Sequence, residues 1–546
     1  MSLLSRHRTI IFVLLALTIQ LSVYFFLARH ESSITPPNHV HTLHPLDLYY
    51  PAIIRESKLG AWTITDPYTT LPTPAIHAYV FFILAGKIAA LFRIDPIAMY
   101  ELSRILGGVF LFIAIYWCMT KLLPKSLHII ALLFALAVDT GPVWTDIVSK
   151  PMMQWSAAMS GETLTERAFG LPHHTIGEAL GLIVLTLIIR TIKTPTVLLL
   201  AVIFLLSFTG TSFAPPYFII LATCLYLPWL LYALATKSIK KTFPPILFSF
   251  AGIVLAGLWI KFEFSKGTPW SDYVAVEKAW WPMREVFLKF IQSFSLYYPF
   301  VLLLIIFTPH SLKKWPKAIR QTLFLVSCWS ILPFGLIVLS ALSFFPIANG
   351  RIASDVSQVP MSFLATFGVY ALWQTIKPFR HAKKFLMTIL LLWTGFSLLL
   401  STSYIKRSLE EHIRSRDKED FGWTLYPTTY LWDGIMALRE VPLYSHVMVL
   451  PHVGALLPTY FPVHVYSGPP YSYTDWWKKR YTSHRFYTGQ MSGSEVDAFL
   501  AKNAISYVFY GPEEVMATKT SLFYPDRLEI QYQNPEVTIF KVIQRK

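Results

Sequence analysis

A short stretch directly after the first apolar run carries residue types that could transfer a proton. In HPLDLYYPAIIRESK, Asp47 is followed by Tyr50 and Arg55. If residues 47 to 59 form a helix, Asp47 and Tyr50 share a face and Arg55 lies about two turns further on. A carboxylate held at a membrane surface can accept a proton from a hydroxyl as a general base. An interfacial helix, with its tyrosines in the aromatic belt and Asp47 as its N-terminal cap, explains the same residues, so both interpretations stay open.

A histidine pair follows later in the chain. Glu162, His173 and His174 lie in SGETLTERAFGLPHHTIG, where the two histidines come directly before a predicted helix. A helix N-terminus favours anions, and imidazoles bind phosphate or sugar hydroxyls, so we interpret this segment as a candidate binding site. A loop that is simply solvated at the membrane interface would carry the same residues.

Two single residues between apolar runs could also contact a substrate. Arg351 lies in FFPIANGRIASDVSQVP, and a guanidinium offers a phosphodiester planar, forked donors that stay charged. Snorkelling of a basic side chain to the interface is the alternative for Arg351. Asp66 precedes a proline in TDPYTTLPTP, which predicts a turn, with substrate contact as the second interpretation.

Motifs for metals and nucleotides are missing from the sequence. There is no Gly-rich phosphate loop, Cys-x-x-Cys, His-Glu-x-x-His or Gly-x-Ser-x-Gly. The trio His39, His41 and His44 has no matched second cluster, which argues against a zinc site. All three cysteines lie in apolar runs, where packing is their expected role. We therefore predict no metal and no cofactor.

The composition shows which elements must position these residues. Of 546 residues, 54% are hydrophobic and only 14% are charged, which is typical of an integral membrane protein. The run from Thr9 to Ala28 is long enough to span a bilayer and has no cleavage site after it, so we predict an uncleaved anchor. Further apolar runs predict about eleven or twelve spans in all. They begin near Ala75, Arg104, Ile176, Thr196, Tyr217, Pro244, Phe290, Gln321, Ser357 and Phe385, with a shorter piece at 127–138.

The basic residues predict how these spans are oriented. The net charge of +16 is concentrated in the short loops RTIKT, KSIKK, HSLKKWPKAIR and KPFRHAKK, which indicates cytoplasmic loops and no nucleic-acid partner. The N-terminus is then cytoplasmic, and segments 139–175, 209–216, 263–289 and 346–356 are extracytoplasmic. Asp47 and segment 139–175 lie on the same side only if an even number of crossings separates them, yet three apolar stretches lie between. Two arrangements stay open: the short 127–138 piece does not cross fully, or KLLPKS is a cytoplasmic turn.

The sequence predicts two domains. Residues 1–403 form a transmembrane module, with the first extracytoplasmic loop at 29–74. After Tyr404 the composition turns polar, and residues 404–546 read as an extracytoplasmic α/β domain. In it, HVMVLP, ISYVFYG and VTIFKVI predict strands, and SGSEVDAFLAKNA predicts a helix with a serine cap.

The order of these features resembles a known class of enzymes. Asp47 followed by YYPAIIRESKLGAW, and then DPYTTLPTP leading into YVFFILAGKIAALF, is similar to the first loop of GT-C glycosyltransferases of the protein-mannosyltransferase and aminoarabinose-transferase type (family 39-like). GLPHHTIGEALGL, GRIASDVSQVP and the terminal ISYVFYGPEE and VTIFKVI look like a bacterial branch of that class. Two departures are that Asp47 is followed by Leu48 instead of a second acid, and that LPTP replaces the usual KPP.

The resemblance implies a polytopic α-helical fold with a soluble α/β domain, and a place in the bacterial inner membrane. It implies Asp47 as the base, Asp66, His173 and His174 as pocket lining, and Arg351 as a ligand of the lipid phosphate. An enzyme that faces away from the cytoplasm has no nucleotide sugar, so its donor should be a sugar on polyprenyl phosphate within the membrane lipids. Transfer to an extracytoplasmic lipid, glycan or protein would invert the anomeric carbon. Tyr50, Arg55 and Glu162 complete the expected substrate-binding set.

Two other classes of function are compatible with parts of the sequence. A transporter or lipid flippase needs ionisable residues or paired broken helices within the spans. The predicted spans contain few ionisable residues and no obvious paired, broken helices, which argues against this class, although Lys87 in the second span is an exception. A non-catalytic envelope scaffold could use the aromatic PPYSYTDWWKKRY to bind carbohydrate or a partner. Packing of those rings within the protein is the simpler interpretation.

Overall fold

The computed structural model describes most of the chain as two compact units. The described residues are 18, 48–138, 140–158, 171–272, 283–342, 350–352, 358–377, 381–414, 427–469, 475–518 and 524–543. One unit comprises Met1–Tyr24, Arg104–Lys261 and Glu277–Arg407, and we call it the helical unit. The other comprises Phe25–Ser103, Phe262–Val276 and Ser408–Lys546, and we call it the mixed unit. Each unit is therefore assembled from segments that are far apart in the sequence.

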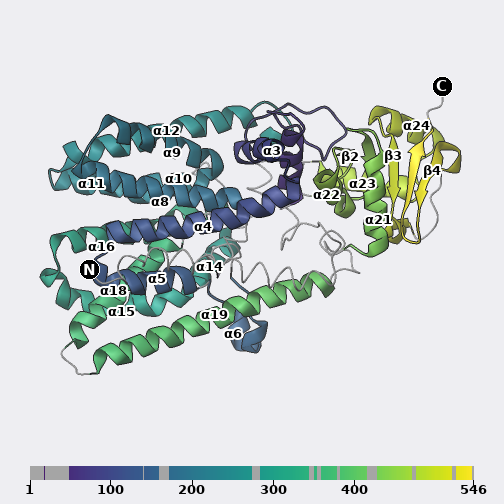
Figure 1. The fold of residues 1–546 in the computed structure, drawn as a ribbon. Coiled ribbons are helices and arrows are strands. Elements are labelled where there is room, and N and C mark those ends of the chain that lie inside the picture. Colours follow the sequence, from purple (N-terminus) through teal and green to yellow (C-terminus); the bar gives the residue numbers. More distant parts are fainter. Residues whose placement is uncertain are drawn as a thin grey trace. The chain divides into compact units, whose positions relative to one another are not determined.

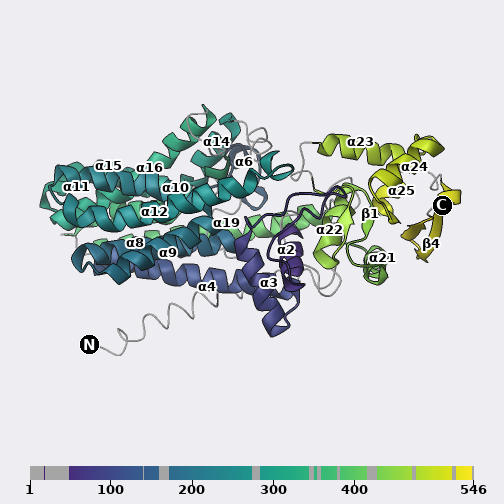
Figure 2. The same cartoon turned by 90° about the horizontal axis from the view of Figure 1, so that it is seen from above.

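Long apolar helices build the helical unit. They are α4 (Pro96–Leu122), α5 (His128–Ala137), α8 (Pro172–Lys193), α9 (Val197–Phe213), α10 (Pro215–Ile220), α11 (Leu227–Ala235), α12 (Ile239–Phe264), α14 (Met283–Ser293), α15 (Tyr298–Ser311), α16 (Lys317–Ala341), α18 (Val359–Ile376) and α19 (Ala382–Arg414). Figures 1 and 2 show most of them side by side with their axes roughly aligned. Helices that are apolar on nearly every side form such a bundle when lipid replaces water around them.

The helices agree with the predicted membrane spans. Eight helices in the described part of the chain are long and apolar enough to cross a membrane, and three shorter apolar helices lie at Val80–Phe92, Lys125–Ala135 and Val197–Phe213. These helices correspond one for one to the apolar stretches predicted after the first. The predicted first span, Thr9 to Ala28, lies outside the described residues except for Thr18. The chain is a multi-pass integral membrane protein.

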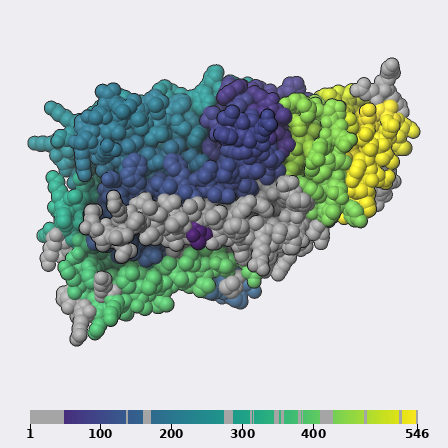
Figure 3. Space-filling view, viewed as in Figure 1, coloured from purple at the N-terminus to yellow at the C-terminus, as the bar shows by residue number. Residues whose placement is uncertain are grey.

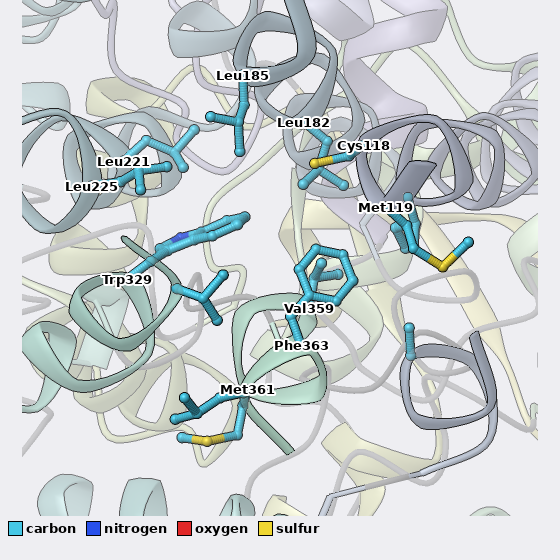
Figure 4. Close-up of a cluster of buried hydrophobic side chains, with 14 of the residues drawn as sticks. Cys118, Met119, Leu182, Leu185, Leu221, Leu225, Trp329, Val359, Met361 and Phe363 are labelled. Carbon is cyan, nitrogen blue, oxygen red and sulfur yellow. The ribbon is translucent and has the colours of Figure 1, made fainter. Parts of the chain in front are cut away.

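The centre of the helical unit is a close-packed apolar cluster (Figure 4). Cys118 of α4 lies beside Leu182 of α8, and Trp329 of α16 faces them from the other side. Gly368 brings α18 directly against α15, because a Cβ built there would lie 1.8 Å from the carbonyl oxygen of Phe300. All three cysteines are free, and Cys118 is fully buried, which confirms the predicted packing role for that residue.

The C-terminal region, residues 427–543, is built on a five-stranded sheet. Its strands have the order β2-β1-β3-β5-β4. They are β1 (His446–Met448), β2 (His464–Val465), β3 (Tyr507–Tyr510), β4 (Leu528–Gln533) and β5 (Thr538–Val542). β1 pairs in parallel with β2 and β3, whereas β5 pairs antiparallel with β3 and β4. Because β1, β3 and β5 fall within HVMVLP, ISYVFYG and VTIFKVI, the three predicted strands are confirmed.

Helices pack around this sheet. They are α21 (Thr429–Ala437), α22 (Pro451–Tyr460), α23 (Trp476–Tyr487), α24 (Gly493–Lys502) and α25 (Pro512–Thr518). The predicted serine cap is present, since Ser492 Oγ accepts the amide hydrogen of Glu495 and the Glu495 side chain accepts that of Ser492. Inside, the Tyr487 hydroxyl donates to the carbonyl oxygens of Met448 and Phe509 and so ties α23 to β1 and β3.

Two adjacent glutamates at the start of α25 cap the start of α22. Glu514 accepts the amide hydrogens of Leu450 at 2.8 Å and Gly511 at 2.9 Å. Glu513 accepts those of His452 and Val453. Burial, together with the charge of Glu513, raises the pKa of Glu514 to about 8 from an ordinary value of 4.5. The folded state therefore holds the Glu514 proton more tightly than the unfolded chain does.

We expect the C-terminal region to lose stability as pH rises. The folded pKa of Glu514 lies above its unfolded value. The stability that its tighter proton binding gives the folded state is therefore fully present below about pH 4.5, and it is lost as the pH rises to about 8. Amide hydrogen exchange of peptides covering Leu450 to Val453, corrected for intrinsic rates, should therefore be faster at pH 8 than at pH 5. Glu514→Gln should flatten this dependence and Glu529→Gln, at an exposed position, should not. Equal pH dependence in wild type and Glu514→Gln would contradict the prediction.

Candidate active site

The first-loop segment, residues 48–79, begins with a short helix. This helix, α2, runs from Tyr49 to Lys58, and Leu48 occupies its N-cap position without a side-chain cap. Asp47 and Glu162 themselves lie outside the described residues. The structure does describe Tyr50, Arg55 and Asp66, all in the mixed unit.

Tyr50 belongs to a buried aromatic group. Its ring stacks on Phe82 of α3 (Val80–Phe92) with centroids 4.3 Å apart, and lies parallel to Tyr100 of α4 at 6.5 Å. The helices α2 and α3 pack closely because Gly86 has no side chain: a Cβ there would lie 2.5 Å from the carbonyl oxygen of Ile54. These contacts fix the rotation of α2 about its own axis.

Arg55 points from α2 to the C-terminal end of α22. Its Nε donates to the carbonyl oxygen of Thr459 at 3.1 Å, and its guanidinium also donates to that of Tyr460. Carbonyl groups at the end of a helix lack intrahelical partners and attract cations. Burial lowers the pKa of Arg55 to about 10, partly offset by Asp95, so the group stays charged at neutral pH.

Asp66 forms the turn that the sequence predicts. Its Oδ1 accepts the amide hydrogen of Tyr68 at 2.9 Å, and its side chain is almost fully buried. The next residues lie along the sheet edge, where Val465 donates its amide hydrogen to the Pro67 carbonyl oxygen at 2.9 Å. Figure 3 shows the purple residues of the first-loop segment directly against green residues of the C-terminal region.

Lys479 is a buried cation beside the turn at Asp66, and the sequence analysis did not single it out. It lies on the inward face of α23, only 5% exposed, and its ammonium donates to the Tyr68 carbonyl oxygen at 3.5 Å. Burial lowers the pKa of Lys479, and the carboxylates of Asp475 and Asp66 oppose this shift. The available signal was the helical spacing of WWKKRYTSHRFY, which places Lys479 and Phe486 together on the apolar side.

The far end of the first-loop segment is fixed by residues in the last turn of α12 and directly after it. The Glu263 carboxylate accepts the amide hydrogen of His77 at 2.7 Å and pairs with the ammonium of Lys266 at 2.7 Å. The Trp270 indole donates to the Pro74 carbonyl oxygen at 2.7 Å. The segment therefore has fixed contacts at its start, its middle and its end.

The histidine pair and Arg351 come together in the helical unit. His173 and His174 lie in the first turn of α8, directly after Pro172, with their rings perpendicular and 4.3 Å apart. Arg351 is close enough to His173 to interact with it electrostatically, although 178 residues separate them in the sequence. The structure thus brings these three predicted site residues together within this unit.

Two buried ionisable residues near the same helix end were missed. Glu178 lies one turn after His174 on α8 and is 1% exposed, and Arg104 on α4 is 3% exposed. The two helices approach closely here, since a Cβ at Gly107 would lie 3.2 Å from the Ile176 side chain. Charged residues within membrane helices are costly and usually functional, which was the available signal. Both were treated only as parts of apolar runs.

Asp146 organises the described part of the predicted segment 139–175. It is nearly buried in α6 (Trp144–Ser149), pairs with Lys150 at 2.7 Å, and accepts the amide hydrogen of Ser156 at 2.8 Å. Arg407 of α19 lies 3.7 Å away. Burial raises the pKa of Asp146, but the hydrogen bonds from Lys150 and Ser156 outweigh it and the net shift is downward. Asp146 is thus an ionised structural centre.

No group of three potential metal-ligating side chains occurs among the residues that the structure describes. The trio His39, His41 and His44 lies outside that part of the chain. The polar side chains that are brought together, Arg351 beside His173 and His174, are suited to bind an anion, since a guanidinium and imidazoles offer donors.

Comparison with solved structures reveals the fold. The chain aligns with ArnT from Cupriavidus metallidurans bound to undecaprenyl phosphate at a TM-score of 0.53 and 12% identity, over 99% of this chain and 98% of ArnT. It aligns with the arabinofuranosyltransferase AftD from Mycobacteria at a TM-score of 0.56 and 13% identity, over 100% of this chain but only 40% of AftD. The apo oligosaccharyltransferase of Archaeoglobus fulgidus gives 0.50 and 11%, over 94% and 70%.

The chain has a GT-C-like fold. The similarity is one of structure, because no family model matches the sequence and no curated protein does either. Both the helices and the C-terminal sheet of this chain fall within the alignment to ArnT, which covers 99% of this chain. The fold predicted from the order of sequence features is therefore confirmed, at identities too low for motif-by-motif transfer.

Proposed function

We propose that this chain is a membrane glycosyltransferase that moves a sugar from a polyprenyl-phosphate donor to an acceptor hydroxyl. The observation that carries this proposal is the GT-C-like fold over the whole chain, shared end to end with ArnT, whose structure contains undecaprenyl phosphate. The number of membrane helices fits a donor whose lipid chain stays in the bilayer. The acceptor would be a lipid, glycan or protein.

In the proposed reaction, Asp47 takes the proton of the acceptor hydroxyl as the oxygen attacks the anomeric carbon of the sugar. A new carbon–oxygen bond forms while the bond to the lipid phosphate breaks, and the electron pair leaves with the phosphate. Attack from the side opposite the leaving group inverts the anomeric carbon. Arg351 would stabilise the phosphate charge, with His173 and His174 beside it, because fixed donors act strongly where water is excluded. Because a fixed cation such as Arg351 can stabilise the leaving phosphate, we propose that the reaction proceeds without a metal.

The other predicted residues divide into two groups. The contacts of Tyr50, Arg55 and Asp66 to protein atoms support a role in holding the first-loop segment in place. Glu162 stays a candidate for substrate binding near the histidines. Glu178 and Arg104, both buried near the same end of α8, join it as candidates.

We further propose that the reaction occurs on the extracytoplasmic side of a bacterial inner membrane. The basic loops between the spans support this orientation, since lysine and arginine concentrate on the cytoplasmic side. Nucleotide sugars are absent from the extracytoplasmic side, which explains why the enzyme would need a lipid-linked donor. The N-terminus would be cytoplasmic, and residues 404–546 would form an extracytoplasmic domain.

The contacts of Lys87 weaken the transporter alternative. Its ammonium donates to the carbonyl oxygens of Ser57 at 3.0 Å and Gly60 at 2.7 Å, and lies 4.5 Å from the centre of the Trp62 ring. It thus satisfies the C-terminal end of α2, which is a structural use for the cation. One observation supports the scaffold alternative: Trp477 and Tyr481 on α23 are exposed. In a glycosyltransferase the same two side chains could contact the acceptor.

Reconstitution tests the function directly. The purified full-length protein in liposomes would receive a lipid extract from the native membrane carrying a tritiated sugar on polyprenyl phosphate, together with the native acceptor fraction. We expect the label to move from the lipid fraction to the acceptor with time. Solute counter-flow in the same liposomes without label transfer would instead establish the transporter alternative.

A further inference from the structure

The start of α2 is held by the end of α22 through a reciprocal pair of contacts. The Thr459 hydroxyl donates to the carbonyl oxygen of Leu48 at 2.5 Å. In return, the carbonyl oxygen of the same threonine accepts from Nε of Arg55 at 3.1 Å. Leu48 and Thr459 are both fully buried, so water does not compete for these bonds. One residue of α22 therefore contacts both the N-cap residue and the last turn of α2.

These two contacts restrain different motions of α2. Leu48 and Arg55 are seven residues apart, which is about two helical turns and about 10 Å along the axis. Two fixed points at that separation determine both the position and the direction of the helix. The residue that precedes Leu48 is Asp47, so the contact with Thr459 lies next to the proposed base.

A second set of contacts fixes the same segment to the same part of the C-terminal region. The Tyr68 hydroxyl donates to the carbonyl oxygen of Ala455, in the middle of α22, at 3.2 Å. The carbonyl oxygen of Pro67 accepts the amide hydrogen of Val465 in β2. The carbonyl oxygen of Thr69 lies 3.2 Å from Nδ1 of His464. Gly468 permits this packing, since a Cβ there would lie 2.4 Å from the Tyr68 ring. The first-loop segment is thus attached to the edge of the sheet as well as to α22.

We infer that α22 of the C-terminal region positions the first-loop segment for catalysis, with Thr459 and Arg55 as the positioning residues. The inference rests on the proposed function and adds to it a role for the C-terminal region. Neither residue needs to touch the sugar. They act by fixing where the chain enters α2, because reacting groups lose rate steeply when they are displaced by even about 1 Å.

Thr459→Val is the variant that tests this inference, because it keeps the shape of the side chain and removes only the hydroxyl. In full-length protein we expect faster amide exchange in peptides covering residues 48–58. We also expect kcat for sugar transfer to fall about ten- to a hundredfold, with little change in KM for the donor lipid. Thr459→Ser restores the hydroxyl and should recover both properties. Thr488→Val, at the end of α23, is the matched control and should change neither.

The outcomes separate this inference from the proposed function. Exchange in β3 peptides reports whether the sheet is intact, so a folding failure is recognised independently of activity. Unchanged exchange of residues 48–58 in Thr459→Val would overturn the inference whatever the activity. Faster exchange with an unchanged kcat would overturn it as well, provided that Asp47→Asn is inactive. If Asp47→Asn is fully active, the proposed base fails, while the exchange data still decide whether α22 holds α2.

Discussion

Replacing Asp47 with asparagine should lower the rate of sugar transfer by about 10²- to 10⁴-fold, the usual contribution of a general base. Asparagine has nearly the same size and can still accept a hydrogen bond, but its amide does not take up a proton at neutral pH. KM for the donor lipid should change little, because the base acts on the acceptor hydroxyl as the new bond forms. The assay is transfer of tritiated sugar by purified protein in liposomes.

Two controls make the Asp47 result specific. Asp526→Asn changes a carboxylate at the surface of the C-terminal region and should keep full activity. Amide exchange of α2 peptides should be the same in Asp47→Asn and wild type, which separates lost chemistry from lost structure. Full transferase activity in Asp47→Asn would remove the centre of the proposed mechanism, and Glu178 would then be the carboxylate to test.

Arg351→Gln should reduce transfer by about 10²- to 10³-fold, the effect typical of removing one fixed group that stabilises developing charge. Arg351→Lys should recover only part of this loss, because an ammonium keeps the charge but lacks the forked, planar donors that fit a phosphate. Single-turnover kinetics would show whether binding of the donor or the bond-breaking step is affected. We expect the larger effect on the bond-breaking step, where the lipid phosphate gains charge.

Arg190 offers a matched control for Arg351. It lies in the last turn of α8, the helix whose first turn carries His173, and it is exposed. Arg190→Gln should leave transfer unchanged, since the two ends of a helix of 22 residues are about 30 Å apart. Equal losses in both variants would indicate a general effect of charge on the membrane protein and would contradict a specific role for Arg351.

The membrane helices could be predicted from the sequence because their signal is local. A run of apolar residues is sufficient to require a helix in lipid, where every backbone group must be satisfied internally. The turn at Asp66 was predictable for the same reason, since its hydrogen bond reaches only two residues along the chain. The serine cap at Ser492 also depends on neighbouring residues alone, and the strand at Tyr507–Tyr510 was indicated by its local run of apolar residues.

The partners of Arg55 could not be predicted in this way. Its charge suggested a substrate ligand, yet its guanidinium contacts carbonyl oxygens that lie 404 and 405 residues further along the chain. No periodicity or motif encodes a backbone carbonyl as a partner, because every residue has one. Lys479 was missed for a related reason, since its burial depends on how α23 packs against the first-loop segment.

The discontinuous composition of the mixed unit has a consequence for how the protein is made. A ribosome that adds about 5 to 20 residues per second completes α22 some 20 to 80 s after α2, given the separation of 404 residues. During that interval the Leu48 carbonyl oxygen and the Arg55 guanidinium, which contact Thr459 in the finished protein, have no C-terminal region to bind. A chaperone or the translocation channel would be well placed to shield them. A chain shortened after Tyr404 would keep these groups without their partners in α22, so its loss of activity would report a misplaced first-loop segment as much as a missing domain.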